Sequence, residues 1–362
     1  MLKALRYPML YRNHRALLWA LLIAVGILGL VLWWPAGYRN RNGTDAAILF
    51  EKTVRERVDI KAKHVETFQL AISRISDEDL KRATQIVYWI CPSADDCLLQ
   101  APFFDMGAKF RVSKQYKLNA CAIYKNMSTV LTAIMCYLFD STLIRDASNF
   151  RNQWNSNRSC IGKNEFWVLR DVENLLGDRF SKLNNFALVR EPMERFLSGL
   201  INQCTELERC GECKDAACLL GMLDENGRET VRTGDFRLGH RGYSVEEHVN
   251  LHFLPQSWQC KFDRYLNDYQ LLKYTSSDTD GIAAQMSALF KQVGVSAEEI
   301  DFIEEQLKGG RSIHSTLGNE KRTRAERELT HSPALMRRFM ALFFFDYILL
   351  GFPLPRVEAI PF

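Results

Sequence analysis

A polar loop between two apolar segments is the part of this sequence best suited to binding an anion. It runs Tyr-Lys-Asn-Met-Ser-Thr and separates the short apolar run Asn119–Tyr124 from the apolar run VLTAIMCYLF. If a strand precedes the loop and a helix follows it, the helix start offers unpaired backbone N–H groups and a positive dipole end. A capped helix with a solvated lysine is the alternative. The predicted phosphate site consists of Lys125, Asn126, Met127, Ser128 and Thr129.

A second candidate anion site combines an arginine with a serine eight residues later. Arg190 ends the apolar run Asn185–Val189, and Ser198 lies in a helix predicted to begin at Pro192. A planar guanidinium and a hydroxyl can hold one phosphate from two sides. A buried Arg–Glu structural network is the alternative interpretation. The sequence has no G-x-x-x-x-G-K-[ST] motif, which disfavours an ordinary ATPase or kinase.

Three histidines are candidates for a general base, because imidazole titrates near neutral pH. His248 and His252 are four residues apart in HVNLHFLPQSWQC and would share one face of a helix. His314 lies in the segment RSIHST and could also contact a nucleotide. No H-E-x-x-H motif is present and no third ligand is apparent, so a metal pair is not predicted.

The candidate residues need an α/β fold to position them. A short strand, a polar loop and a buried helix form the beginning of a βαβ unit. We therefore predict an α/β domain with a P-loop-like parallel sheet flanked by helices. Three further helices are marked by capping residues: Ser76 to about Ile90, a capping box at Ser296-x-x-Glu299, and Ser332-Pro333 to Gly351.

An uncharged segment near the N-terminus predicts a membrane anchor. At 1.5 Å per residue, residues 16–34 span about 28 Å as a helix, which matches a bilayer core. The segment ends in Trp-Trp-Pro, unlike a signal-peptide cleavage site, and more basic residues precede it than follow it. We expect a cytoplasmic tail (1–15), a transmembrane signal-anchor (16–34), a stem (35–50) and a lumenal domain (51–362).

Composition and cysteine positions agree with a folded lumenal domain. The 362 residues are 47% apolar and 25% charged, which excludes a disordered, collagenous or coiled-coil chain. All ten cysteines follow the predicted anchor, so disulfides are favoured over a zinc site at Cys210-x-x-Cys213. Sequons at Asn42 and Asn157 predict glycosylation, whereas Asn126 also heads a sequon but should stay unmodified in a binding loop.

The positive net charge does not indicate a nucleic-acid partner. The whole chain carries a formal charge of +4, but residues 1–41 hold six Lys or Arg and no acidic residue. Residues 42–362 therefore carry a formal charge of −2. The basic balance reflects membrane topology, and any attraction for an anionic substrate must come from local clusters.

Together, the two anion-site segments resemble the Golgi carbohydrate sulfotransferases. The closest likeness is to the branch with the chondroitin and dermatan 4-O-sulfotransferases and the HNK-1 sulfotransferase. That branch has a P-K-x-x-x-T-like loop, matched here at Lys125 and Thr129, with Tyr124 where proline is usual. The hydrophobic segment Phe345–Phe352 is also similar, and the likeness covers roughly residues 115–352. The later V-R-[DE]-P-x-x-R-x-x-S segment is matched at Val189, Arg190, Glu191, Pro192, Arg195 and Ser198.

This resemblance implies a type II Golgi membrane enzyme that transfers sulfate from 3′-phosphoadenylyl sulfate (PAPS) to a glycan hydroxyl. The branch favours the 4-hydroxyl of N-acetylgalactosamine in chondroitin. By the same likeness Lys125 and its loop bind the 5′-phosphosulfate, Arg190 and Ser198 bind the 3′-phosphate, and no metal is required. His252 is the favoured base, because the branch has a histidine upstream of a Pro and a Cys, here Pro255 and Cys260.

Two other functions remain open at this stage. Asp278-Thr279-Asp280 is formally a D-x-D motif, which could hold a metal in a type II Golgi glycosyltransferase. The same residues lie in Ser-Ser-Asp-Thr-Asp-Gly, which is also typical of a solvated turn. Because the family usually has proline at the position of Tyr124, an inactive lumenal scaffold with the same fold is a second alternative.

Overall fold

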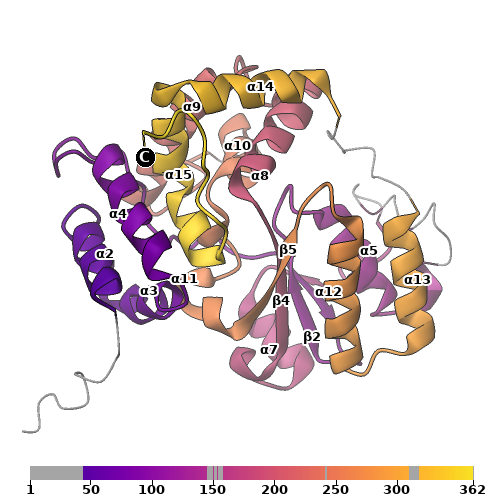
Figure 1. Cartoon of the computed structure of the whole chain (residues 1–362). Coiled ribbons are helices and arrows are strands. Elements are labelled where there is room, and N and C mark those ends of the chain that lie inside the picture. The colour runs from indigo at the N-terminus through magenta and orange to yellow at the C-terminus, as the bar shows by residue number, and fades with distance from the viewer. Residues whose placement is uncertain are drawn as a thin grey trace, which may run out of the picture. The chain divides into compact units, whose positions relative to one another are not determined.

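The computed structural model describes residues 44–144, 150, 153, 158–240, 243–309 and 318–361. The predicted anchor and cytoplasmic tail, the sequons at Asn42 and Asn157, and His314 lie outside these residues. Residues 45–362 form one compact unit, shown in Figure 1. Among the helices of the described segments, none is long and apolar enough to cross a membrane.

A five-stranded mixed sheet forms the centre of this unit. Its strand order is β3-β1-β2-β4-β5, and β2, β4 and β5 run parallel while β1 is antiparallel to both of its neighbours. The predicted parallel sheet is therefore confirmed for β2, β4 and β5, whereas β1 and β3 make the sheet mixed. Only residues 114–117 join β1 to β2, and so short a connection can join antiparallel strands alone. The strands are β1 (Phe110–Ser113), β2 (Leu118–Cys121), β3 (Glu165–Phe166), β4 (Asn184–Arg190) and β5 (Tyr269–Tyr274).

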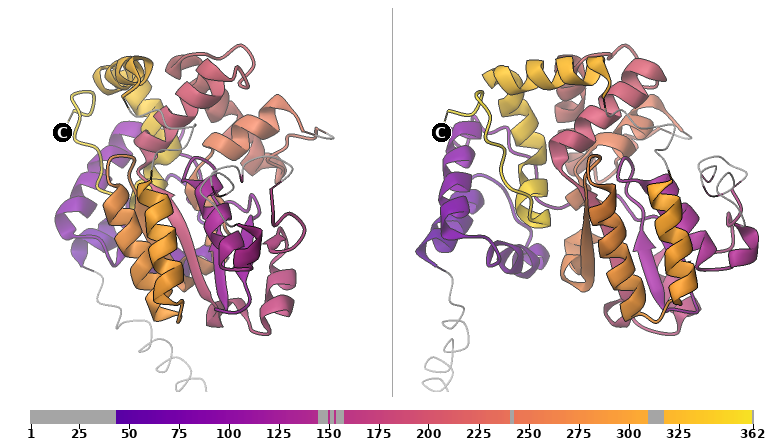
Figure 2. Two further views of the ribbon diagram at one scale, coloured as in Figure 1. Left: turned by 90° about the vertical axis from the view of Figure 1, so that its right-hand side faces the viewer. Right: turned by 45° about the vertical axis from the view of Figure 1, so that its right-hand side comes forward.

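Strand β4 is buried on both faces, which explains its continuous apolar sequence. On one face Phe186 and Leu188 pack in a core with α5 (Ser128–Tyr137), α12 (Thr279–Gln292) and α13 (Ala297–Lys308). On the other face Ala187 and Val189 belong to the larger core. Figure 2 shows α12 and α13 side by side along the sheet.

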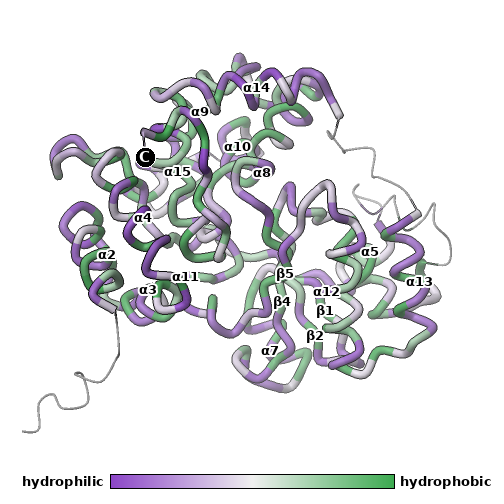
Figure 3. The backbone as a smooth tube through the Cα atoms, viewed as in Figure 1, coloured by the Kyte–Doolittle hydropathy of each residue, from purple (hydrophilic) through white to green (hydrophobic). Residues whose placement is uncertain are grey.

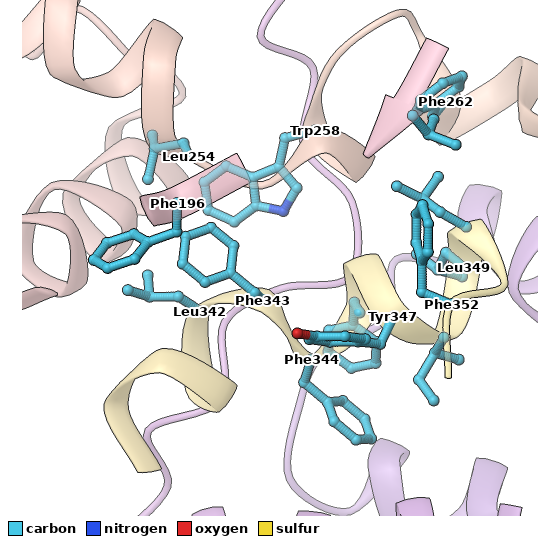
Figure 4. Close-up of a cluster of buried hydrophobic side chains, with 14 of the residues drawn as sticks. Phe196, Leu254, Trp258, Phe262, Leu342, Phe343, Phe344, Tyr347, Leu349 and Phe352 are labelled. Atoms are coloured by element: carbon cyan, nitrogen blue, oxygen red, sulfur yellow. The ribbon is translucent and has the colours of Figure 1, made fainter. Parts of the chain in front are cut away.

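The larger core is built around the last helix, α15 (Pro333–Leu350). This helix is apolar on nearly all sides and is buried from Phe339 to Leu350, as expected for a helix surrounded by other elements. Figure 4 shows its aromatic residues beside Phe196 and Trp258. The helices α2 (Asp45–Arg55), α3 (Val65–Ile72) and α4 (Asp77–Ile90) also contribute to this core, and α2 buries Phe50 completely.

The helix starts that the sequence predicted are confirmed. The Ser76 hydroxyl accepts from Asp79 N–H at the start of α4, and Ser296 and Glu299 form a capping box on α13. Helix α15 begins at Pro333, and Gly351 is its C-cap. Helix α14 is largely hydrophilic (Figure 3). The remaining α-helices are α7 (Leu169–Leu176), α8 (Pro192–Gly199), α9 (Ala216–Thr233), α10 (Val245–Phe253), α11 (Phe262–Tyr265) and α14 (Glu320–His331).

Several short 3₁₀ turns and one π-helix complete the described elements. The π-helix η4 continues directly from α8, and the turn η5 leads from α10 towards β5. These elements are η1 (Ala62–His64), η2 (Ser141–Leu143), η3 (Phe180–Lys182), η4 (Leu200–Glu206), η5 (Gln256–Trp258) and η6 (Leu266–Asp268).

All ten cysteines form disulfides, as the sequence predicted. Cys210 and Cys213 belong to two different bonds, so they do not form a zinc pair. Such oxidation is typical of a domain that folds in the lumen of the secretory pathway. The five bonds are Cys91–Cys97, Cys121–Cys260, Cys136–Cys160, Cys204–Cys210 and Cys213–Cys218.

Removing the Cys121–Cys260 disulfide should destabilise the protein more than removing Cys204–Cys210. The two bonds close loops with sequence separations of 139 and 6 residues. The loop-closure entropy of the unfolded chain therefore predicts a stabilisation of about 5 kcal/mol from Cys121–Cys260 and about 2 kcal/mol from Cys204–Cys210. Urea unfolding of the two double Cys→Ala variants, in detergent, measures this difference. An equal loss of unfolding free energy in both variants would contradict the expectation.

Candidate active site

The candidate site lies where the three parallel strands end. Because β2, β4 and β5 run in the same direction, their carboxyl ends meet at one edge of the sheet (Figure 1). The polar loop follows β2, Arg190 is the last residue of β4, and Ser276 lies two residues after β5. The structure thus brings together two segments that are more than sixty residues apart in the sequence.

The polar loop has a backbone suited to holding an anion. Lys125 and Met127 both have left-handed backbone angles, with φ of 67° and 58°, although neither is glycine. Alternation of left- and right-handed residues aims successive N–H groups into one concavity. Met127 is also the N-cap of α5 and makes no side-chain cap, so the N–H groups of Ser128 and Thr129 stand at an open helix start. Such strain at non-glycine residues is characteristic of functional loops.

Asn126 anchors the loop and does not face a ligand. Its side chain is fully buried, and Nδ2 donates to the Leu188 carbonyl at 2.8 Å and to Gln256 Oε1 at 2.5 Å. Gln256 Oε1 also accepts from Arg190 N–H at 3.0 Å, while Gln256 Nε2 donates to the Arg190 carbonyl at 2.8 Å. The loop and the end of β4 are therefore held in fixed register. This burial agrees with the expectation that the sequon at Asn126 stays unmodified.

A carboxylate of the C-terminal helix supports Gln256. The two Asp346 oxygens accept from the backbone N–H groups of Gln256 and Ser257, each at 2.8 Å. Asp346 is completely buried, and burial raises its pKa while these donors and Arg195 oppose the shift. The hydrophobic C-terminal segment thus positions a residue next to the candidate site.

Arg195 is an internal clamp. Its Nε donates to the Tyr124 carbonyl at 3.2 Å, and Nη1 donates to the Phe253 and Leu254 carbonyls at 3.1 Å each. The side chain is fully buried, and burial lowers its pKa to about 10. Arg195 therefore joins the polar loop to the end of α10, and its role is to position the loop.

Arg190 reaches across the site. Its Nη1 donates to the Lys125 carbonyl at 2.9 Å, Nη2 donates to the Ser276 hydroxyl, and Nε lies 3.5 Å from Glu194 Oε2. Ser276 was not predicted, because β5 was not recognised in the sequence. Ser198 is buried in α8. Burial lowers the pKa of Arg190.

Lys125 is held by the π-helix that follows α8. Its Nζ donates to Asn202 Oδ1 at 2.8 Å, and the neighbouring Gln203 contacts His248 Nε2 through Oε1 at 3.0 Å. Burial, followed by the nearby charge of Arg190, lowers the pKa of Lys125 to about 7. Neither amide residue was predicted from the sequence, since a π-helix insertion leaves no clear periodic signal.

The two predicted histidines lie on one face of α10, with their rings stacked at 4.1 Å. The His252 Nδ1–H donates to the His248 carbonyl at 2.7 Å, which leaves the lone pair of Nε2 available as a proton acceptor. Both ring nitrogens of His248 have partners, Tyr243 and Gln203. Burial lowers the pKa of His248 to about 4 and that of His252 well below its usual value. The hydrogen bonds favour His252 over His248 as a base.

Tyr124, the departure from the sulfotransferase pattern, contacts the candidate base directly. The Tyr124 ring stacks on the His252 ring with 4.3 Å between their centroids, and Lys109 Nζ lies 3.1 Å from the centroid of the Tyr124 ring. The tyrosine therefore packs as part of the site.

The D-x-D residues do not form a metal site. The Asp278 carboxylate accepts from Gly281 N–H at 2.7 Å and caps α12, and the Asp280 side chain is 87% exposed beside Lys308. Within the described residues, no group of three or more His, Cys, Asp or Glu could hold a metal ion. Asp278 is therefore the N-cap of α12, and Asp280 lies in the first turn of that helix.

Comparison with known proteins identifies the class to which this fold and site belong. The family model described as "Sulfotransferase family" matches residues 108–353, which include both anion-site segments and the sheet. The chain belongs to the sulfotransferase family, which confirms the resemblance seen in the sequence. Membership implies PAPS as the sulfate donor.

Two similar proteins come from Caenorhabditis elegans. Carbohydrate sulfotransferase chst-1 is 24% identical over 263 residues, 69% of this chain and 77% of that protein. An uncharacterised protein is 28% identical over 277 residues, 74% of each chain. No solved structure matches.

The affinity for adenosine 3′,5′-bisphosphate, the product that PAPS leaves, should fall as the pH rises above 7. With a pKa of about 7 in the free protein, Lys125 is charged below this pH and neutral above it. A bound phosphate favours the charged form, so binding above pH 7 takes up a proton and weakens by up to about tenfold per pH unit. Calorimetry should give a Kd at pH 9 at least ~10-fold higher than at pH 7.

The variant Lys125→Met provides the control, because its Kd should be high and nearly constant over this range. Titration of the ligand interferes little, since the second pKa of a phosphate monoester is about 6. A wild-type Kd that does not change between pH 7 and 9 would show that Lys125 does not contact the nucleotide.

Proposed function

We propose that this protein is a PAPS-dependent carbohydrate sulfotransferase that acts on the 4-hydroxyl of N-acetylgalactosamine in chondroitin. The observation that carries the proposal is the convergence of Lys125, Arg190 and His252 at the carboxyl edge of the parallel strands. Family membership supports sulfate transfer, and similarity to a carbohydrate sulfotransferase supports a glycan acceptor. The chondroitin 4-hydroxyl rests on the likeness to that branch of the family.

Lys125 and the loop residues 126–129 would bind the 5′-phosphosulfate through an ammonium, hydroxyls and backbone N–H groups. Arg190 and Ser198 would bind the 3′-phosphate. A guanidinium has five N–H donors, and three of those on Arg190 face Lys125, Ser276 and Glu194. Two donors remain for a phosphate, so the internal contacts orient the guanidinium without occupying it fully.

In the proposed reaction an acceptor hydroxyl attacks the sulfur of PAPS in line with the departing 5′-phosphate. The new O–S bond forms as the bond from sulfur to the phosphate oxygen breaks, and His252 Nε2 takes the hydroxyl proton. Lys125 balances the charge that builds on the leaving phosphate. The low pKa of His252 keeps it neutral before the donor arrives, and the anionic donor raises that pKa towards the range needed for proton transfer.

The proposed setting is the Golgi membrane. Residues 1–15 would form a cytoplasmic tail, 16–34 a single anchor, 35–50 a stem and 51–362 the lumenal catalytic domain. The five disulfides support a lumenal location for the described domain. An inactive scaffold finds no support at Tyr124, because its ring packs on the candidate base.

Incubation of the full-length protein with radiolabelled PAPS and a panel of desulfated glycosaminoglycans tests this function. We expect label on chondroitin, and a loss of about 100-fold or more in the Arg190→Ala variant, since charge-assisted hydrogen bonds to phosphate contribute about 1.5–3 kcal/mol each. The matched control is Arg232→Ala, at an exposed position. Label on heparan alone would overturn the chondroitin proposal, and undiminished transfer by Arg190→Ala would overturn the site.

The two histidines should differ in their effect on turnover. Loss of a general base lowers kcat by about 10²–10⁴-fold. The variant His252→Gln should show this loss while its Kd for adenosine 3′,5′-bisphosphate stays unchanged, whereas His248→Gln should lose less. A His252→Gln variant with wild-type kcat would exclude this residue as the base.

A further inference from the structure

Lys109 is a buried lysine beside the candidate site, and its side-chain ammonium has no hydrogen-bond partner in the part of the chain that the structure describes. It immediately precedes β1, and its carbonyl accepts from Ala122 N–H at 2.9 Å, at the start of the polar loop. The residue is only 9% exposed. Its Nζ finds no hydrogen-bond acceptor among the described residues and lies over the rings of Tyr124 and Trp167, 3.1 Å and 5.3 Å from their centroids. A buried ammonium has three donors, and leaving them unpaired is costly.

The charges around Lys109 come from two arginines and two glutamates and balance one another, so no carboxylate is left to neutralise its ammonium. Arg111 and Arg158 share the carboxylate of Glu165, which lies 3.2 Å from Arg111 Nη2 and 2.5 Å from Arg158 Nε. Glu165 is therefore already engaged. Burial and the positive charges of these two arginines lower the pKa of Lys109. The negative charge of Glu247 opposes this shift only in part. The surroundings of Lys109 lack one negative charge, and an arriving anion would restore the charged ammonium.

An exposed aromatic side chain lies beside this lysine. Trp167 follows the edge strand β3, is 59% exposed, and has its ring centroid 5.3 Å from Lys109 Nζ. Large aromatic rings offer an apolar face at little entropic cost, and the C–H face of a pyranose is apolar. A ring for a sugar and a cation for an acid are thus adjacent.

We infer that Lys109, Tyr124 and Trp167 form an acceptor subsite for the carboxylate of a uronic acid next to the sugar that is sulfated. The inference rests on the proposed function and adds the residues that select an acidic glycan. Tyr124 links this subsite to catalysis, because the same ring contacts Lys109 and stacks on His252. The donor phosphates are assigned to Lys125 and Arg190, which leaves Lys109 for the acceptor.

The test compares chondroitin with carboxyl-reduced chondroitin, in which glucuronate has been converted to glucose. For the full-length wild type we expect the KM for the reduced polymer to be about 10–100-fold higher, the range for one charge-assisted hydrogen bond. Lys109→Met should raise the KM for chondroitin by a similar factor and leave the KM for the reduced polymer unchanged. Its Kd for adenosine 3′,5′-bisphosphate should equal that of the wild type, which also reports correct folding.

Two further variants separate the roles in the subsite. Trp167→Ala should raise the KM for both polymers equally, because stacking does not sense charge. Lys114→Met, an exposed lysine in the turn after β1, should change neither value.

Three outcomes would overturn the subsite. A wild type that uses both polymers equally well excludes carboxylate recognition, whatever the variants do. Equal losses on both polymers in Lys109→Met would assign Lys109 a structural role only. Transfer to neither polymer by the wild type would overturn the proposed function, and the subsite with it.

Discussion

One glutamine side chain fixes the geometry on which the candidate site depends. The Gln256 amide pairs with both backbone groups of Arg190 and also accepts from Asn126, and Asp346 holds its backbone. Leaving one such buried group unpaired costs about 1–3 kcal/mol, so these segments cannot shift independently. The left-handed residues of the polar loop are therefore held by a helix more than two hundred residues away. The hydrophobic C-terminus serves the site through this contact.

The sequence predicted the elements that carry local signals. Ser76, Pro192, the Ser296 capping box and Ser332-Pro333 each mark a helix start through contacts within one turn, and all four are confirmed. Strands β1, β3 and β5 were missed, and β1 and β3, with four and two residues, show no usable alternation. The sheet predicted from the sequence was therefore parallel, whereas the observed sheet is mixed.

The roles of polar residues could be predicted only in part. Asn126 lies in the correct loop, but its burial depends on Gln256, 130 residues further along the chain. Lys109, Asn202 and Ser276 lie outside the predicted motifs and join the site only through the pairing of strands and the π-helix. Tyr124 was seen as a departure from the family pattern, and its contact with His252 required the structure. Long-range pairing thus decides which polar side chains meet.

The Cys121–Cys260 bond has a consequence for when the protein can become active. Cys121 ends β2, three residues before Tyr124 at the start of the polar loop, and Cys260 follows the turn that contains Gln256. The bond therefore closes a covalent ring around the loop and its anchor. Assembly of the donor site and oxidation of the chain become a single maturation step. A newly made chain that has not met an oxidising compartment would hold the polar loop loosely, so the proposed donor site would form only where disulfides form.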